Sequence, residues 1–152
     1  MWLRHAQVKC EAWEPGENQD RFVGVHTGYQ RLPDPVTHRR TVMFDKKMRI
    51  VEITDDLLCR GEHVAESYWH FAETCDVSLE REGSVLAVNG ERKIRLIPSD
   101  RGVEADLQRG KAGPIGGWVS RQFDVKTEST TVVWRSAISG DTQLRTRIEI
   151  LD

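Results

Sequence analysis

The chain has 152 residues, a length typical of one domain that can bury a core without disulfides or metals. Hydrophobic residues make up 38% of it and charged residues 30%, a balance that indicates a folded globular protein and excludes a disordered one. Lys and Arg total 22 against 24 for Asp and Glu, so a dedicated nucleic-acid-binding protein, which usually carries a basic excess, is not expected. No apolar run approaches the roughly 18 residues of a membrane-spanning helix.

Apolar and polar residues alternate along most of the chain, which is the pattern of half-buried β-strands. The final run shows it best, because Leu144, Thr146, Ile148 and Ile150 are separated by charged residues. In chain order, the runs that we expect to form strands are 8–13, 21–27, 37–45, 49–58, 62–71, 77–82, 85–88, 92–97, 103–108, 130–138 and 144–150.

Turn residues separate these runs. Asn89-Gly90 lies between two apolar runs, which is the strongest short hairpin signal. Residues 15–20 and 111–117 lack strand patterning, and we expect them to be irregular loops. About ten or more short strands with tight turns predict an all-β antiparallel sandwich, formed by residues 1–152 as a single domain.

The sequence lacks the common catalytic and nucleotide-binding motifs, including a nucleophile elbow, a glycine-rich phosphate loop and HExxH. Cys10, Cys59 and Cys75 form no CxxC pair, and we expect free thiols that are buried or half-buried. His63 and His70 are seven residues apart on one expected strand, hence on opposite faces, and are not expected to share a metal ion. We therefore predict no catalytic residue and no metal ligand in this chain.

The sharpest basic cluster is His38-Arg39-Arg40. It fits either a solvated strand face or a contact with an anionic polymer, since guanidinium groups bind carboxylate and sulfate bidentately. The carboxylate pair Asp55-Asp56 lacks the arrangement of an acid and base pair, and we expect it at a turn or on the surface.

The aromatic residues divide into two groups. Trp69 and Trp134 sit inside apolar runs and are expected in the core, together with Tyr68. Trp13 and Trp118 lie next to loops and are the candidates for exposed, sugar-stacking positions. Tyr29 follows Gly28 in an expected loop, where its phenol could reach a substrate.

Several segments together resemble the C-terminal region of the heparinase II/III-like family. The resemblance covers roughly residues 20 to 150, and no segment in it is a catalytic signature. The segments are Gly28-Tyr29-Gln30-Arg31-Leu32-Pro33-Asp34-Pro35-Val36-Thr37-His38-Arg39-Arg40-Thr41-Val42-Met43-Phe44-Asp45, Ile53-Thr54-Asp55-Asp56-Leu57, Gly61-Glu62-His63, Trp69-His70-Phe71-Ala72 and Gly117-Trp118-Val119-Ser120.

The resemblance implies a bacterial parent protein with an α-helical toroid upstream of antiparallel β-sheets. Such lyases cleave acidic polysaccharides, for example heparin-like glycosaminoglycans or alginate, by β-elimination at a uronic acid. Some members hold a structural metal through His-x-Asp, Asp-x-Gly and His-Asn-Thr segments. This chain has no His-Asn-Thr and no His-x-Asp. The family's metal ligands and catalytic residues are therefore expected upstream, and this chain is expected to hold no cofactor.

Three functions remain open on this basis. The first is a non-catalytic C-terminal domain of a lyase, with acidic polysaccharide and the upstream toroid as partners. The second is a free-standing module that binds anionic carbohydrate through His38, Arg39, Arg40, Tyr29 and Trp118. The third is a purely structural or interaction sandwich. The compartment does not follow from the residues, although the resemblance implies a periplasmic, cell-envelope or secreted parent.

Overall fold

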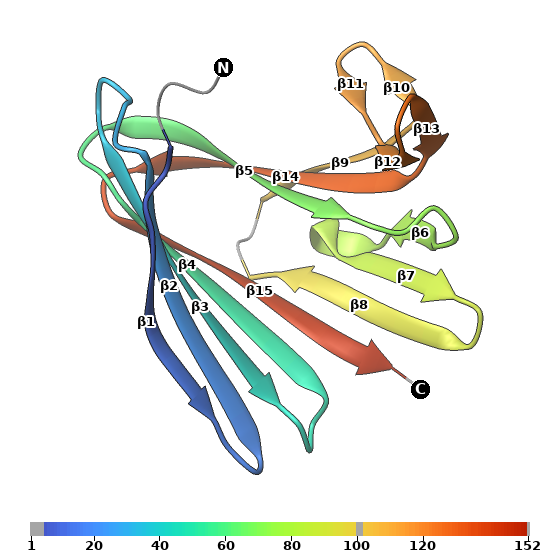
Figure 1. Cartoon of the computed structure of the whole chain (residues 1–152), viewed down its shortest axis with the longest axis horizontal. Coiled ribbons are helices and arrows are strands. Elements are labelled where there is room, and N and C mark those ends of the chain that lie inside the picture. The colour runs from blue at the N-terminus through green and yellow to red at the C-terminus, as the bar shows by residue number, and fades with distance from the viewer. Residues whose placement is uncertain (1–4, 100–101, 152) are drawn as a thin grey trace. The chain divides into compact units, whose positions relative to one another are not determined.

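The computed structural model describes residues 5–99 and 102–151, and almost all of its regular structure is β (Figure 1). It contains fifteen strands and one short 3-10 turn, η1 (Arg81–Gly83). The fold is an all-β sandwich of antiparallel strands, as the alternation predicts. Among the described residues, none forms a helix with the length and apolar character needed to cross a bilayer.

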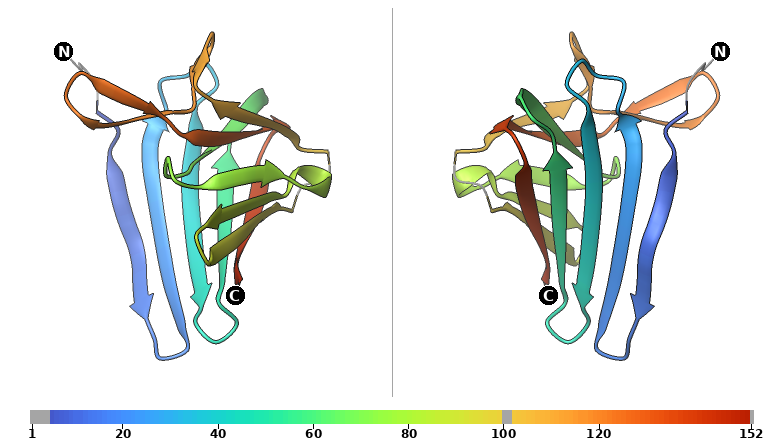
Figure 2. Two further views of the ribbon diagram at one scale, coloured as in Figure 1. Left: turned by 90° about the vertical axis from the view of Figure 1, so that its right-hand side faces the viewer. Right: turned by 90° about the vertical axis from the view of Figure 1, so that its left-hand side faces the viewer.

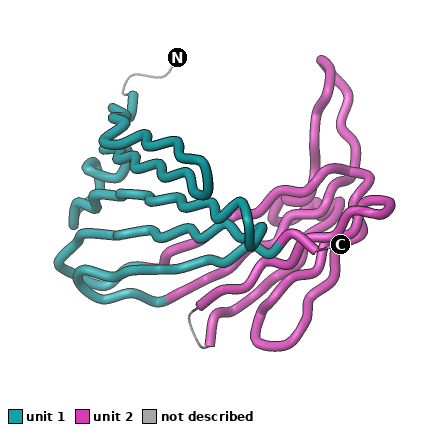
Figure 3. The backbone as a smooth tube through the Cα atoms, turned by 90° about the horizontal axis from the view of Figure 1, so that it is seen from below, with its two compact units in different colours: residues 1–63, 137–149 teal, residues 64–136, 150–152 magenta. Residues whose placement is uncertain are grey.

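The chain divides into two compact units, which Figure 3 colours separately. Unit 1 comprises residues 1–63 and 137–149, and unit 2 comprises residues 64–136 and 150–152. The prediction of a single domain over residues 1–152 stays a prediction.

Unit 1 contains five neighbouring strands in the order β1, β2, β3, β4, β15. Figure 2 shows β1 to β4 side by side. Their bounds are β1 (Val8–Pro15), β2 (Gln19–Tyr29), β3 (Val36–Asp45), β4 (Ile50–Leu58) and β15 (Thr142–Leu151). Buried side chains in this unit include Val23, Val36, Ile53 and Leu57, all at most 8% exposed. Removing such side chains from water is the main stabilising contribution, at about 1.5–3 kcal/mol for each fully buried one.

The register of unit 1 brings polar residues from three strands onto one face. His26 of β2 lies opposite His38 of β3, and Arg40 of β3 lies opposite Asp55 of β4. Residues directly opposite or diagonal on neighbouring strands share a face and come within contact distance. His38 and Arg40 are two residues apart and so point the same way, whereas Arg39 points to the other face.

Unit 2 contains a β6-β7-β8 meander and the strand order β5-β14-β9. The bounds are β5 (Glu62–His70), β6 (Asp76–Leu79), β7 (Val85–Asn89), β8 (Arg92–Pro98), β9 (Glu104–Arg109) and β14 (Thr130–Ser139). Val132, Val133 and Trp134 of β14 are at most 4% exposed. The expected Asn89-Gly90 hairpin is confirmed: Asn89 pairs with Arg92, and Gly90 supplies the positive φ of 61° that the turn needs.

Two short hairpins replace part of the expected irregular structure. Residues 111–117 were expected to be a loop, but β10 (Lys111–Ala112) pairs with β11 (Ile115–Gly116) there. A further pair, β12 (Trp118–Gln122) and β13 (Val125–Glu128), follows directly.

The expected loop 15–20 shrinks to the three residues 16–18 between β1 and β2. The expected strand 77–82 ends at Leu79, because Glu82 and Gly83 turn the chain with positive φ values.

Three expectations about burial need correction or refinement. Tyr68 is 51% exposed rather than in the core, because strand alternation turns it outward when Trp69 faces in. Asp55 lies within β4 and is only 7% exposed, so it is neither a turn nor a surface residue. All three cysteines are free, as expected, but Cys10 is exposed because it lies on β1 at the end of the strand order. Trp134 is buried as expected and contacts Trp69 edge to face.

Candidate functional site

Four residues of unit 1 form a connected polar cluster, here called the histidine network: His26, His38, Arg40 and Asp55. Nε2 of His26 lies 2.9 Å from Nδ1 of His38, and Nε2 of His38 lies 2.5 Å from Oδ1 of Asp55. Arg40 donates to both carboxylate oxygens of Asp55, through Nε at 2.6 Å and through a terminal nitrogen at 2.9 Å. This bidentate contact is the strongest kind of ion pair that arginine makes.

One arrangement of protons satisfies every contact in the histidine network. The backbone N–H of Gly28 donates to Nδ1 of His26 over 3.1 Å, so that nitrogen must be unprotonated. His26 therefore carries its proton on Nε2 and donates to Nδ1 of His38, which in turn donates from Nε2 to Asp55. Both imidazoles are neutral in this arrangement, and a second proton on either ring would break a hydrogen bond.

The environment of the network shifts two pKa values. Burial raises the pKa of Asp55, but hydrogen bonds from His38 and Arg40 outweigh it and hold that pKa below its ordinary value. Burial lowers the pKa of His26, and electrostatic interactions with His38 and Arg40 lower it further. The network therefore combines an ionised Asp55 with a His26 that resists protonation.

Arg39 lies outside the histidine network and makes its own ion pairs. Its Nε donates to Glu11 over 2.8 Å, and a terminal nitrogen lies 3.4 Å from a carboxylate oxygen of Asp56. The side chains of Arg39 and Arg40 remain 37% and 41% exposed. Each basic residue of His38-Arg39-Arg40 is thus paired with a carboxylate of the same chain. Contact of this cluster with an anionic polysaccharide stays a prediction.

The two aromatic candidates differ in setting. Tyr29 is 43% exposed, and its ring centre lies 5.2 Å from that of His26, which brings it beside the histidine network. Trp118 belongs to unit 2 and is half-buried. Its indole N–H donates to the backbone oxygen of Lys111 over 2.9 Å, and Nζ of Lys126 lies 4.1 Å from its ring centre. One face of Trp118 is therefore covered by a cation of its own chain.

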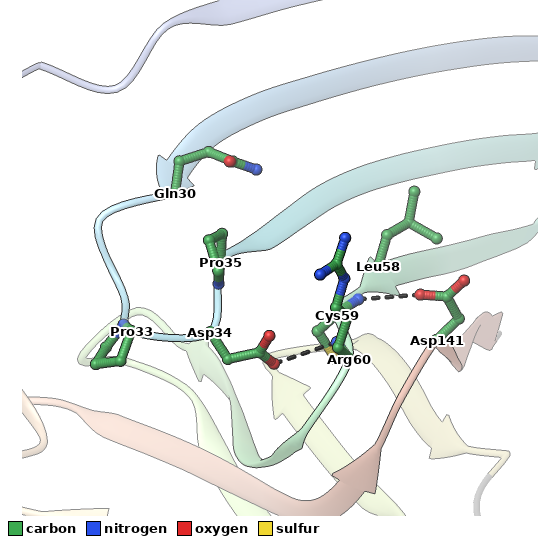
Figure 4. A pocket seen from close by; sticks show the side chains of 8 residues that line it. All are labelled: Gln30, Pro33, Asp34, Pro35, Leu58, Cys59, Arg60 and Asp141. Carbon is green, nitrogen blue, oxygen red and sulfur yellow. Dashed lines mark hydrogen bonds between the residues drawn. The ribbon is translucent and has the colours of Figure 1, made fainter.

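A pocket of about 590 Å³ lies at one end of the unit 1 strands (Figure 4). Its lining comes from the β2–β3 loop, the end of β4 with the following turn, and the β14–β15 turn. The lining residues are Gln30, Pro33, Asp34, Pro35, Leu58, Cys59, Arg60 and Asp141.

Asp34 connects the β2–β3 loop to the β4–β5 turn. Its Oδ2 accepts the backbone N–H of Gly61 at 2.8 Å and that of Arg60 at 3.2 Å, and lies 2.7 Å from Nε2 of His63. The Gly61 hydrogen bond is the largest influence that lowers the pKa of Asp34, followed by His63. Asp34 is therefore a fixed anion at the edge of the pocket.

Cys59 is 9% exposed and lies beside Asp34 and His63. Its thiol donates to the backbone oxygen of Gly140 over 3.1 Å, and its backbone N–H donates to Oδ1 of Asp141 over 3.0 Å. Burial raises the pKa of the thiol, and the carboxylates of Asp34 and Asp141 raise it further. The ligand atoms of Asp34, Cys59 and His63 all lie within 4.8 Å of one another.

Sequence reasoning did not single out this cluster. The available signal was the spacing of Cys59 and His63, four residues apart across the Arg60-Gly61 turn. Asp34 lies 25 residues before Cys59, and only the pairing of β2, β3 and β4 brings it there.

The family assignment rests on the sequence. The model of the family described as "Heparinase II/III-like, C-terminal" matches residues 1–150. The chain belongs to this family. No curated protein matches the sequence.

Solved structures of heparinases share the fold of this heparinase II/III-like chain. Heparan sulfate lyase HepC from Pedobacter heparinus matches with a TM-score of 0.80 and 16% identity, over 96% of this chain and 22% of that one. A crystal structure of heparinase III matches with a TM-score of 0.74 and 17% identity, over 95% of this chain and 21% of that one. At these identities the similarity shows the fold. This heparinase II/III-like chain thus spans about a fifth of the length of these relatives.

Proposed function

We propose that this chain is the C-terminal β-sandwich of a larger lyase that cleaves uronate-containing polysaccharide by β-elimination. The observation that carries the proposal is the family match over residues 1–150, in a chain that spans 22% of a heparan sulfate lyase. In this proposal the domain supports the fold or one wall of the substrate cleft, and the reacting groups belong to the upstream toroid and early β region of the parent.

The contacts of the described residues support a non-catalytic role. β-Elimination needs a base, an acid, and donors that neutralise the substrate carboxylate, all within hydrogen-bond reach of one another. Arg40 and His38 are engaged by Asp55, and Arg39 is engaged by Glu11 and Asp56. These donors already neutralise carboxylates of the protein itself.

The phenol of Tyr68 is also unsuited to act as a base. Its hydroxyl donates to Glu66 over 2.7 Å. That hydrogen bond, with burial and the charge of Glu66, raises the pKa of Tyr68 and so disfavours the phenolate. Tyr29 remains the one aromatic hydroxyl beside the histidine network, and we assign it together with His38, Arg39, Arg40 and Trp118 to substrate contact at most.

The direct test is an elimination assay on the purified chain. Heparin, heparan sulfate and alginate are each incubated with the chain, and the ultraviolet absorbance of unsaturated uronate is followed, with a heparinase III as positive control. We expect no increase in absorbance from the chain. An increase that disappears in a Tyr29→Phe variant would show that the chain is itself a lyase and would overturn the assignment.

A second experiment tests whether this chain is part of a larger protein. An immunoblot of source cells with an antibody against this chain should show a band far above 17.4 kDa, located in the periplasm, envelope or medium. A band at 17.4 kDa would instead favour the free-standing carbohydrate-binding module, with the partly exposed Arg39 and Arg40 as its first residues to test.

A further inference from the structure

Asp34, Cys59 and His63 bring three different metal-binding atoms together in unit 1: a carboxylate oxygen, a thiol sulfur and an imidazole nitrogen. All of these atoms lie within 4.8 Å of one another, although Asp34 lies in the β2–β3 loop, Cys59 in the β4–β5 turn and His63 near the start of β5. We propose that the Asp34–Cys59–His63 cluster is a zinc site that joins the β2–β3 loop to the β4–β5 turn. The proposal does not depend on whether the parent is a lyase.

The ligand set selects zinc among the common metal ions. Zinc is bound by cysteine, histidine and aspartate in tetrahedral sites, whereas calcium and magnesium prefer oxygen ligands alone. A thiolate and a carboxylate also balance the two positive charges of the ion. The resulting complex is neutral, which suits a site where Cys59 is buried and Asp34 and His63 are half-buried.

The distances require only small side-chain movements. Tetrahedral zinc with ordinary bond lengths holds its nitrogen, oxygen and sulfur ligands roughly 3.3–3.6 Å apart. Nε2 of His63 and Oδ2 of Asp34 are 2.7 Å apart and must separate slightly, while no pair of ligand atoms exceeds 4.8 Å. Rotations of side chains provide changes of this size without moving the strands.

Surrounding groups already orient two of the ligands. The backbone N–H groups of Arg60 and Gly61 both donate to Oδ2 of Asp34, which leaves Oδ1 to approach the ion in the described part of the chain. Nε2 of His63, 2.7 Å from the same Oδ2, gives up that contact when it binds the ion. The backbone of Cys59 is held by Asp141 through a 3.0 Å hydrogen bond. Hydrogen bonds to ligand residues of this kind fix their orientation and strengthen metal binding.

The pocket supplies the route and the remaining coordination position. Asp34 and Cys59 both line it, as does Asp141 (Figure 4). An ion can therefore enter from the pocket, and a water molecule from it can complete the tetrahedron. The site differs from the structural metal implied by the family resemblance, which uses His-x-Asp and His-Asn-Thr segments that this sequence lacks.

Cobalt binding tests the proposal by spectroscopy. The starting protein is a Cys10→Ser, Cys75→Ser variant, in which Cys59 is the only thiol of the sequence. We expect one equivalent of Co²⁺ to give the intense visible bands of tetrahedral coordination and a thiolate-to-cobalt band in the near ultraviolet. One equivalent of Zn²⁺ should abolish both. Absence of stoichiometric binding would overturn the proposal.

Three further variants of this background assign the ligands. Cys59→Ser should remove the near-ultraviolet band. Asp34→Asn and His63→Gln should each weaken cobalt binding at least about 10-fold, because mutating a residue that only supports a metal ligand already weakens binding by about that factor. His70→Gln is the matched control and should bind as the background does, because His70 is bonded to Thr131 instead. Circular dichroism confirms that each variant is folded. An unchanged band in folded Asp34→Asn and His63→Gln would show binding by the thiol alone and would also overturn the site.

Discussion

Asp55 illustrates how one buried carboxylate can organise a sheet face. Its two oxygens accept hydrogen bonds from His38 and from Nε and one terminal nitrogen of Arg40. A buried charge is tolerated only when it is paired and hydrogen-bonded, and here the partners come from the neighbouring strand β3. Removing the charge would leave Arg40 and His38 without their acceptor.

The variant Asp55→Asn should therefore destabilise the chain, by about 2–3 kcal/mol, somewhat less than the loss for a fully buried pair because Arg40 is 41% exposed. Asp56→Asn is the matched control. Asp56 lies on the other face, 25% exposed, with a 3.4 Å contact to Arg39. It also accepts a 2.7 Å hydrogen bond from Gln143, which the oxygen of Asn can still accept, so this variant should cost under about 1 kcal/mol. Urea unfolding of both variants measures the difference. Equal losses would contradict the structural role of Asp55.

The lowered pKa of His26 predicts a pH dependence of stability. The unfolded chain takes up a proton near the ordinary pKa of 6.5, whereas the folded chain resists it. The free energy of unfolding should therefore be highest above pH 6.5 and decrease as the pH falls below this value toward the folded pKa of His26.

Urea unfolding at a series of pH values above and below the ordinary pKa of histidine measures this dependence. His26→Gln should reduce the slope, because the variant has no imidazole to protonate at that position. A slope that is identical in His26→Gln would show that other groups cause the pH dependence.

At the scale of the element, β5 shows how strand alternation decides exposure. Trp69 contacts Trp134 with ring centres 5.7 Å apart, while the adjacent Tyr68 is 51% exposed and bonded to Glu66. The composition of the run places both aromatic residues in the core, but the strand geometry sends neighbours to opposite faces. Packing against Trp134 turns Trp69 inward, and Tyr68 therefore points outward.

Replacing the buried partner should cost far more than replacing the exposed neighbour. Trp134 is 4% exposed, and its indole N–H donates to the backbone oxygen of Gly83 over 2.9 Å. Trp134→Ala should lower the free energy of unfolding by about 3–5 kcal/mol. Tyr68→Ala is the control and should cost about 1 kcal/mol. Denaturant unfolding compares them, and a smaller loss for Trp134→Ala than for Tyr68→Ala would refute this description of β5.

The short hairpins show where element prediction fails. β10 and β11 have two residues each, too few to display alternation, and they lie in a segment rich in glycine. Their pairing is local, between Lys111 and Gly116 and between Ala112 and Ile115. Sequence patterning therefore indicates a loop, and only the folded backbone reveals the ladder.

At the scale of the whole molecule, the family assignment concerns this chain, whereas the proposed lyase activity concerns a larger parent protein. The family match and the shared fold extend over nearly all of this chain but about a fifth of the solved heparinases. A supporting role for this chain agrees with the pairing of His38, Arg39 and Arg40 with carboxylates of the same chain. The proposed zinc site is local to unit 1 and would operate whatever the rest of the parent does.

Alternation and turn residues by themselves determined the all-β class, eleven of the strands and the Asn89-Gly90 hairpin, because these depend on residues close in sequence. The multi-segment resemblance likewise identified the family. The tertiary structure decided what depends on register. It buried Asp55 between His38 and Arg40, directed Arg39 to separate carboxylates, and brought Asp34 to Cys59 and His63. Strand pairing joins residues that are far apart in sequence, and a one-residue change of register would send Asp55, His38, Arg39 and Arg40 to the opposite faces of their strands.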